Sequence, residues 1–251
     1  METLKKILRS IQVFFPFIQD YRFIVQRTVR KLLNQTHEKD FDALSLFDAK
    51  GKLFVDIGTN RGEAIQSILM RVPSADIIGF EPNPIVYAKT TKVFPDVKIF
   101  NYGLGNQIKT ESLFVPFYNN YMFDGLASFK EHEARGWLRT RLFLYDERKL
   151  ELKTARCELK KLDDFSLDPF FIKIDVQGFE YEVLLGAKET LQCSKPIILL
   201  EAVTPEQIEF LTSLGYWMYY YSDHTLKEGQ GSLNTFFVHP QRKDMVWQSL
   251  N

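Results

Sequence analysis

The fold of this chain is constrained most by a short apolar run that ends in a glycine turn. Residues 53–62 read LFVDIGTNRG. The start of this run is typical of a strand that is buried on both faces, and Gly58 follows where a helical pattern begins. We expect that helix over residues 60–71, because Pro73 blocks its continuation. A strand, a glycine turn and a helix therefore follow one another.

A second apolar run, residues 77–80, ends in Glu81. A strand, a helix and a second strand in this order form a right-handed unit with parallel strands. Both turns then lie at the carboxyl edge of the sheet, where open α/β sheets bind their ligands. The sequence therefore predicts an α/β fold with a ligand site beside Gly58 and Glu81.

The charges of this turn narrow the choice of ligand. A nicotinamide dinucleotide places a pyrophosphate over a G-x-G-x-x-G turn, but this turn has only Gly58 and Gly62, and Asp56 precedes them. A carboxylate there repels pyrophosphate and suits a ligand with a cationic head, such as S-adenosylmethionine. Glu81 would then bind the ribose hydroxyls. An ordinary tight turn is the alternative explanation of the two glycines.

A third short strand is expected over residues 96–101. Its carboxyl end, with Asn101 and Gly103, lies where the adenine of a bound nucleoside would sit in such a sheet. Asn101 either bonds the adenine edge or caps a turn, and the sequence favours neither.

The parallel alternation is interrupted between residues 110 and 162. Strands are expected over residues 112–117 and 151–159, with a loop and a helical or irregular cover between them. Insertions of this length are often lids or binding elements, so we expect substrate choice to depend on this segment. His132 lies within it and is a reserve candidate for a catalytic role, although a lone histidine in a charged segment is more often solvated.

The second informative motif, residues 171–180, reads FIKIDVQGFE. Its strand ends in Asp175, which we expect at the same sheet edge, facing the reactive end of the ligand. Lys173 alternates onto the side of Asp175, so a purely structural ion pair is the alternative. A further strand ends in Glu201, which could join Asp175 in holding a divalent ion. Two acids are weak evidence, so a divalent metal is possible and no metal site is assigned.

Composition excludes some classes of partner. The 251 residues contain 32 Lys plus Arg and 32 Asp plus Glu, so no net charge favours nucleic acid. The two cysteines, Cys157 and Cys193, have no metal-site spacing and suit a reducing compartment. The amino end shows no signal-peptide pattern. Cytoplasmic residence is therefore the default expectation.

Residues 1–33 are basic and rich in aromatic residues, and we expect them to form a helical arm broken near Pro16. Such an arm can lie in a membrane interface. It can also pack on the domain or on a second subunit, as in a homodimer. We favour packing over membrane contact, because the excess of positive charge is modest.

The motifs VDIGTNRG, GFEPNP, LDD at residues 162–164, IKIDVQGFE, LLGA and LLE, in this order, resemble those of the FkbM-type methyltransferases. The resemblance covers about residues 37–239. It implies a class I, S-adenosylmethionine-dependent enzyme that methylates hydroxyl groups on polyketides, sugars or related molecules. Thr59 and Gln177 depart from the commonest pattern, and Gln177 puts in doubt any mechanism that needs a carboxylate there. By this resemblance the cofactor is held by Asp56, Gly58, Asn60, Gly62, Glu81, Asn101 or Gly103, and Asp175 borders the methyl group.

The resemblance implies a Rossmann-like, seven-stranded sheet with helices on both faces. We expect this sheet to be mixed, because residues 216–221 and 235–238 should close it as an antiparallel pair. The expected division is an N-terminal helical arm over residues 1–45, a methyltransferase domain over residues 46–240 and a tail over residues 241–251.

The leading hypothesis is O-methylation of a hydroxyl on a small molecule or glycan. Methyl transfer from a sulfonium needs alignment and exclusion of water, and a positioned carboxylate or histidine can take the hydroxyl proton. Asp175 is the candidate base, with His132 in reserve. The alternative is a binding module that keeps the cofactor fold without turnover. A nicotinamide oxidoreductase is disfavoured by the missing third glycine.

Overall fold

A mixed sheet of eight strands forms the centre of the computed structural model, which describes residues 2–143 and 145–242. The strand order is β11-β10-β12-β9-β8-β1-β2-β3. Five neighbouring strands are parallel, and β12 runs antiparallel between β9 and β10. The parallel strands are β1 (Leu53–Ile57), β2 (Asp76–Phe80), β3 (Lys98–Phe100), β8 (Phe171–Ile174) and β9 (Ile197–Glu201), and the others are β10 (Trp217–Ser222), β11 (Thr225–Glu228) and β12 (Asn234–Val238).

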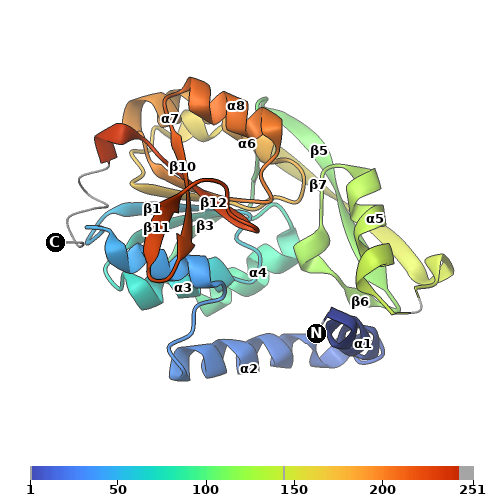
Figure 1. The fold of residues 1–251 in the computed structure, drawn as a ribbon. Coiled ribbons are helices and arrows are strands. Elements are labelled where there is room, and N and C mark those ends of the chain that lie inside the picture. The colour runs from blue at the N-terminus through green and yellow to red at the C-terminus, as the bar shows by residue number, and fades with distance from the viewer. Residues whose placement is uncertain (1, 144, 243–251) are drawn as a thin grey trace.

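Helices cover both faces of this sheet and bury a separate apolar core on each (Figure 1). On one face α3 (Glu63–Arg71) and the 3-10 segment η2 (Lys39–Leu46) pack on Phe54 and Phe171. On the other face three helices pack on Val55 and Ile172. These are α6 (Glu180–Leu185), α7 (Lys188–Ser194) and α8 (Pro205–Ser213), while α4 (Pro84–Val93) connects β2 to β3. The expected mixed α/β sheet with helices on both faces is confirmed.

The inserted segment forms a second sheet beside the first (Figure 1). Its strands β5 and β7 pair antiparallel over ten positions. The sequence predicted both strands but not that they form a sheet of their own. The strand order of this sheet is β4-β7-β5-β6. Its strands are β4 (Gly103–Leu104), β5 (Lys109–Tyr118), β6 (Tyr121–Met122) and β7 (Leu150–Lys160). The helix α5 (Glu131–Arg141) lies between β6 and β7 in the chain and packs on β5 and β7.

The amino-terminal arm consists of α1 (Glu2–Gln12) and α2 (Gln19–Leu32), separated by a break at Pro16 as predicted. One side of the arm packs on the rest of the chain: the Gln19 amide donates to the carbonyl of Met122, and Gln66 donates to the carbonyl of Arg27. The other side exposes large apolar side chains. They include Ile11, Phe14, Phe17, Tyr21, Val25, Val29 and Leu32. Contact with a membrane or a second subunit stays a prediction.

Within the described ranges, no helix is both long enough and apolar enough to cross a bilayer. The expected tail begins in the short 3-10 turn η6 (Pro240–Arg242), and residues 243–251 lie outside the described part.

Two details differ from the prediction. The helix after the glycine turn begins at Glu63 rather than at residue 60, because Gly62 adopts a left-handed conformation with φ of 79°. The sheet also has one strand more than expected, because β10 and β11 form a hairpin. Its turn places Asp223 and His224 at positive φ, a conformation usually signalled by Asn-Gly.

Candidate active site

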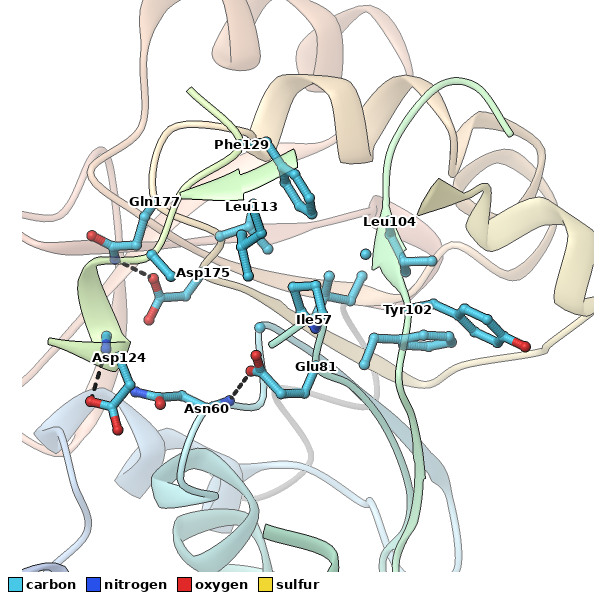
Figure 2. A pocket seen from close by; sticks show the side chains of 17 residues that line it. Ile57, Asn60, Glu81, Tyr102, Leu104, Leu113, Asp124, Phe129, Asp175 and Gln177 are labelled. Atoms are coloured by element: carbon cyan, nitrogen blue, oxygen red, sulfur yellow. Dashed lines mark hydrogen bonds between the residues drawn. The ribbon is translucent and has the colours of Figure 1, made fainter. Parts of the chain in front are cut away.

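A cavity opens at the carboxyl edge of β1, β2 and β8, where the sequence predicted it (Figure 2). The main sheet provides its floor and the inserted segment covers it. The space between its walls is about 610 Å³, which includes volume open to solvent. The lining side chains that the argument below uses are those of Asn60, Glu81, Tyr102, Leu104, Leu113, Asp124, Phe129, Asp175 and Gln177.

Glu81 lies in the middle of this cavity, at the end of β2 (Figure 2). Its carboxylate accepts hydrogen bonds from the backbone N–H of Asn60 at 2.7 Å and of Asn83 at 2.8 Å. Burial raises the pKa of Glu81 to about 7, against the opposing effect of these two N–H groups. The side chain is therefore poised to change charge near neutral pH.

Asp175 lies at the end of β8, and both of its carboxylate oxygens are engaged. Lys173 Nζ lies 3.0 Å from one oxygen, and Gln177 Nε2 donates to the other at 2.7 Å. Burial acts to raise the pKa of Asp175, but Lys173 and Gln177 outweigh it and hold the pKa below its ordinary value. The predicted ion pair therefore exists, and Asp175 lines the cavity as well.

Glu201 lies behind Asp175 and hydrogen-bonds to it. Burial and the charge of Asp175 raise the pKa of Glu201. In the described part of the chain, no group of three or more His, Cys, Asp or Glu side chains is arranged to hold a metal ion.

Gly58 lines the cavity at a φ of +86°. A Cβ at this position would lie 1.9 Å from the backbone oxygen of Asp175. Glycine is therefore required by the close approach of two strand ends, and not only by the conformation of the turn.

Asp56 does not line the cavity, contrary to our expectation. It is fully buried on the opposite side of β1 and pairs in register with Lys173 of β8. Its carboxylate oxygens have no hydrogen-bond partner among the described residues, and burial raises the pKa of Asp56 to about 6. Its position in the strand alternation, one residue from Ile57, turns the side chain away from the ligand edge.

Of the other residues expected to bind the cofactor, some line the cavity and some do not. Gly103 lines the cavity. Gly62 does not, and a Cβ there would meet the ring of Phe94. The Asn101 amide donates to the carbonyls of Glu81 and Pro82 at 2.7 and 3.1 Å, so it adopts the turn-capping alternative.

His132 is not brought to the cavity. Its side chain on α5 is 78% exposed and lies 3.7 Å from Glu133. This placement removes the geometric basis for the reserve catalytic role, because a proton acceptor must lie within hydrogen-bond reach of the reacting group.

Several lining residues were missed by sequence reasoning. Leu104 of β4 is one of them, and its place next to Gly103 was an available signal, whereas Tyr102 lies in the segment where the adenine was expected. Leu113, Asp124 and Phe129 come from the inserted segment, whose pairing was unknown. Their position depends on contacts such as the hydrogen bond from Ser128 Oγ to the carbonyl of Gln177, at 2.8 Å.

Arg61 joins three segments beside the cavity. Its guanidinium pairs with Asp124 of the inserted segment and with Asp20 of α2, and it also lies over the ring of Phe23. Only 4% of Arg61 is exposed. The turn after β1, the arm and the insertion are therefore held together by one buried side chain.

Comparison with known proteins identifies related sequences and structures. A family profile described as "Methyltransferase FkbM domain" matches residues 56–225. The curated protein AMB antimetabolite synthetase AmbE of Pseudomonas aeruginosa is 29% identical over 175 residues, which is 59% of this chain and 8% of AmbE. This chain therefore spans only a small part of that relative.

Among solved structures, one similar protein is methyltransferase FkbM from Methylobacillus flagellatus, with 15% identity and a TM-score of 0.47 over 74% of this chain and 43% of that one. Another is a TehB-like SAM-dependent methyltransferase from Corynebacterium glutamicum, with 10% identity and a TM-score of 0.43. The match covers 87% of this chain and 97% of that one.

Proposed function

This chain belongs to the FkbM methyltransferase family, and from this premise we propose that it transfers a methyl group from S-adenosylmethionine to a hydroxyl group of a small molecule or sugar. The match to AmbE, an antimetabolite synthetase, favours a small acceptor over a macromolecule.

The observation that carries the proposal is the order of side chains along the cavity (Figure 2). Tyr102 and Leu104 supply an apolar end for a flat base. Glu81 in the middle supplies a carboxylate for ribose hydroxyls. Asp175, whose carboxylate also pairs with Lys173, supplies acceptor oxygens at the far end, where the ligand's cationic group would lie. The three parts match an adenosine that carries an onium group.

The bound cofactor would supply an activated methyl group on a positively charged sulfur. The chain's own residues would orient and shield it. Leu113 of β5 and Phe129, which precedes α5, cover the cavity from the inserted segment, and their apolar side chains would exclude water. Asn60 supplies a backbone N–H that already fixes the Glu81 carboxylate.

In the proposed complex, Asp175 is the polar residue that lies nearest to the reacting groups. Its lowered pKa keeps it ionised, which suits the stabilisation of a cation but makes it a weak proton acceptor. We therefore assign Asp175 first to holding the onium group, and its role as base is a separate proposal.

Two measurements test this function. Calorimetry should detect binding of S-adenosylhomocysteine and no binding of NAD. Isotopic methyl transfer should then appear with at least one member of a panel of hydroxylated acceptors. Cofactor binding without transfer to any acceptor would favour the binding-module alternative, and the absence of cofactor binding would refute the proposal.

The variant Asp175→Asn separates the two roles of this residue. Loss of the Asp175 charge should weaken the binding of S-adenosylmethionine more than that of its product S-adenosylhomocysteine. Only S-adenosylmethionine carries a positively charged sulfur. If Asp175 is also the base, turnover at saturating cofactor should fall by about 100-fold or more. Full turnover in this variant would remove Asp175 from the base role.

A further inference from the structure

A second cavity, of about 680 Å³ including space open to solvent, adjoins the first. Its walls come from α1, α2, the turn after β1, the segment after β6, and α5. The two cavities share Asn60, Asp124 and Gly125 as lining residues. A molecule in the second cavity would therefore lie directly beside a cofactor in the first.

Three guanidinium groups line this second cavity, from Arg9, Arg22 and Arg141. None of them forms an ion pair with a carboxylate among the side chains that the structure describes. Arg141 lies over the ring of Trp137 at 4.8 Å, and Arg22 donates to the amide oxygen of Gln12 at 3.0 Å. The guanidinium groups of Arg22 and Arg141 are thus held in place, and none of the three is paired with a carboxylate among the described side chains.

The acidic side chains on the same wall offset this charge only in part. Asp124 is already paired with Arg61. Glu63 is the other acid that lines the cavity. Burial lowers the pKa of Arg141, and the nearby charge of Arg9 lowers it further. The charges of Glu201 and Asp175 oppose this lowering. Three guanidinium groups thus share the cavity wall with two acids, Glu63 and the already paired Asp124, so positive charge is in excess, an arrangement that an anionic ligand would relieve.

Buried polar atoms on this wall also lack partners. Arg22 Nε, the Tyr121 hydroxyl and Asn60 Oδ1 have no hydrogen-bond partner among the described residues. Buried polar groups are nearly always paired in folded proteins. The residues that carry these three atoms all line the second cavity, so its wall holds polar groups whose hydrogen bonds are incomplete.

We propose that this cavity is the acceptor site, and that the acceptor carries a carboxylate or phosphate group bound by Arg9, Arg22 and Arg141. This inference rests on the proposed methyl transfer. Guanidinium groups bind such anions through paired, charge-assisted hydrogen bonds. The arm is then a part of the acceptor site, which completes a wall that the α/β domain alone leaves open.

The first experiment uses the full chain loaded with S-adenosylhomocysteine. Calorimetry compares glucose 6-phosphate, glucuronate and glucose, three hydroxylated probes of similar size. At least one of the anionic probes should bind about tenfold or more tightly than glucose, as charged hydrogen bonds predict. The phosphate and carboxylate arms show which anion is preferred. If the anionic probes bind no better than glucose, or do not bind, the proposal is wrong.

The second experiment uses variants. Arg141→Gln and Arg22→Gln should each weaken binding of the preferred anionic probe about tenfold. Arg139→Gln is the matched control, because Arg139 lies on the same helix but is exposed and does not line the cavity. Equal effects of Arg139→Gln and Arg141→Gln would overturn the assignment.

Cofactor affinity distinguishes failure of this inference from failure of the proposed function. Arg141→Gln should leave the affinity for S-adenosylhomocysteine unchanged. If it weakens that affinity instead, the arginines serve the cofactor and the acceptor assignment is wrong. If the unmodified protein does not bind S-adenosylhomocysteine, the proposed function itself fails.

Discussion

At the scale of single residues, Gly58 combines a positive φ with a backbone atom that leaves no room for a side chain. We expect Gly58→Ala to reduce the free energy of unfolding by about 2 kcal/mol or more, because strain at positive φ is combined with a clash against the Asp175 carbonyl. Gly51→Ala is the control: Gly51 also has positive φ but nothing lies within 4 Å of its Cβ, so about 1 kcal/mol is expected. Urea denaturation measures both, and equal losses would contradict the clash.

Glu81 gives cofactor binding a predicted pH dependence. Its pKa in the free protein is raised to about 7, so the side chain is protonated at lower pH and accepts fewer hydrogen bonds from ribose hydroxyls. Affinity for S-adenosylhomocysteine should therefore rise from pH 6 to pH 8, by up to about tenfold per unit below the pKa.

Glu81→Gln should bind more weakly at pH 8 and lose this dependence, since an amide does not titrate. Calorimetry at three pH values makes the comparison. The same pH profile in both proteins would assign the titration to another group and leave Glu81 without the ribose role.

At the scale of elements, Arg61 is the main polar contact between the arm and the rest of the chain. Arg61→Gln leaves the carboxylate of Asp124, with 7% of its side chain exposed, without its cation. We expect a loss of about 3 kcal/mol in the free energy of unfolding, and faster proteolysis within α2. The control, Arg135→Gln, breaks an exposed pair with Glu131 and should cost less than about 1 kcal/mol. Similar losses in the two variants would contradict this role.

A comparison of the predicted and observed elements shows which parts of the structure are determined by the local sequence. The strands β1, β2, β8 and β9 were predictable, because each is a short apolar run that ends at one sheet edge, in a glycine turn after β1 and in an acidic residue in the other three. The closing antiparallel pair was predicted correctly as well. The β10–β11 hairpin was missed, because its turn lacks the usual glycine.

The candidate site was predictable where it depends on those strand ends. Glu81, Gly58 and Asp175 reach the cavity because the chain order fixes them at its edge. Phe129 and the arginine cluster were not predictable, since their positions depend on long-range pairing between β5 and β7 and on where the arm packs. The expectation that Asp56 lines the cavity was wrong for a different reason. Side chains alternate along β1, so Asp56 points to the face of the sheet opposite to that of Ile57.

At the scale of the whole molecule, cofactor binding should stabilise the fold by mass action. A ligand that binds only the folded state raises the free energy of unfolding by about 2.7 kcal/mol at about 100 times its dissociation constant. We expect this shift with S-adenosylhomocysteine, and a smaller one in Glu81→Gln at the same concentration. Thermal unfolding with NAD is the control. An equal shift with both ligands would indicate non-specific stabilisation.

The contacts of Arg61 limit how enzymes of this kind can be re-engineered. Asp20 and Asp124 are separated by more than a hundred positions, yet both pair with one guanidinium. Consider a chimaera that takes only the inserted segment from another family member, in order to accept a new substrate. Arg61 would lose its partner Asp124 unless the new segment carries an acidic residue at the same place. Arm and insertion should therefore be exchanged as a matched set.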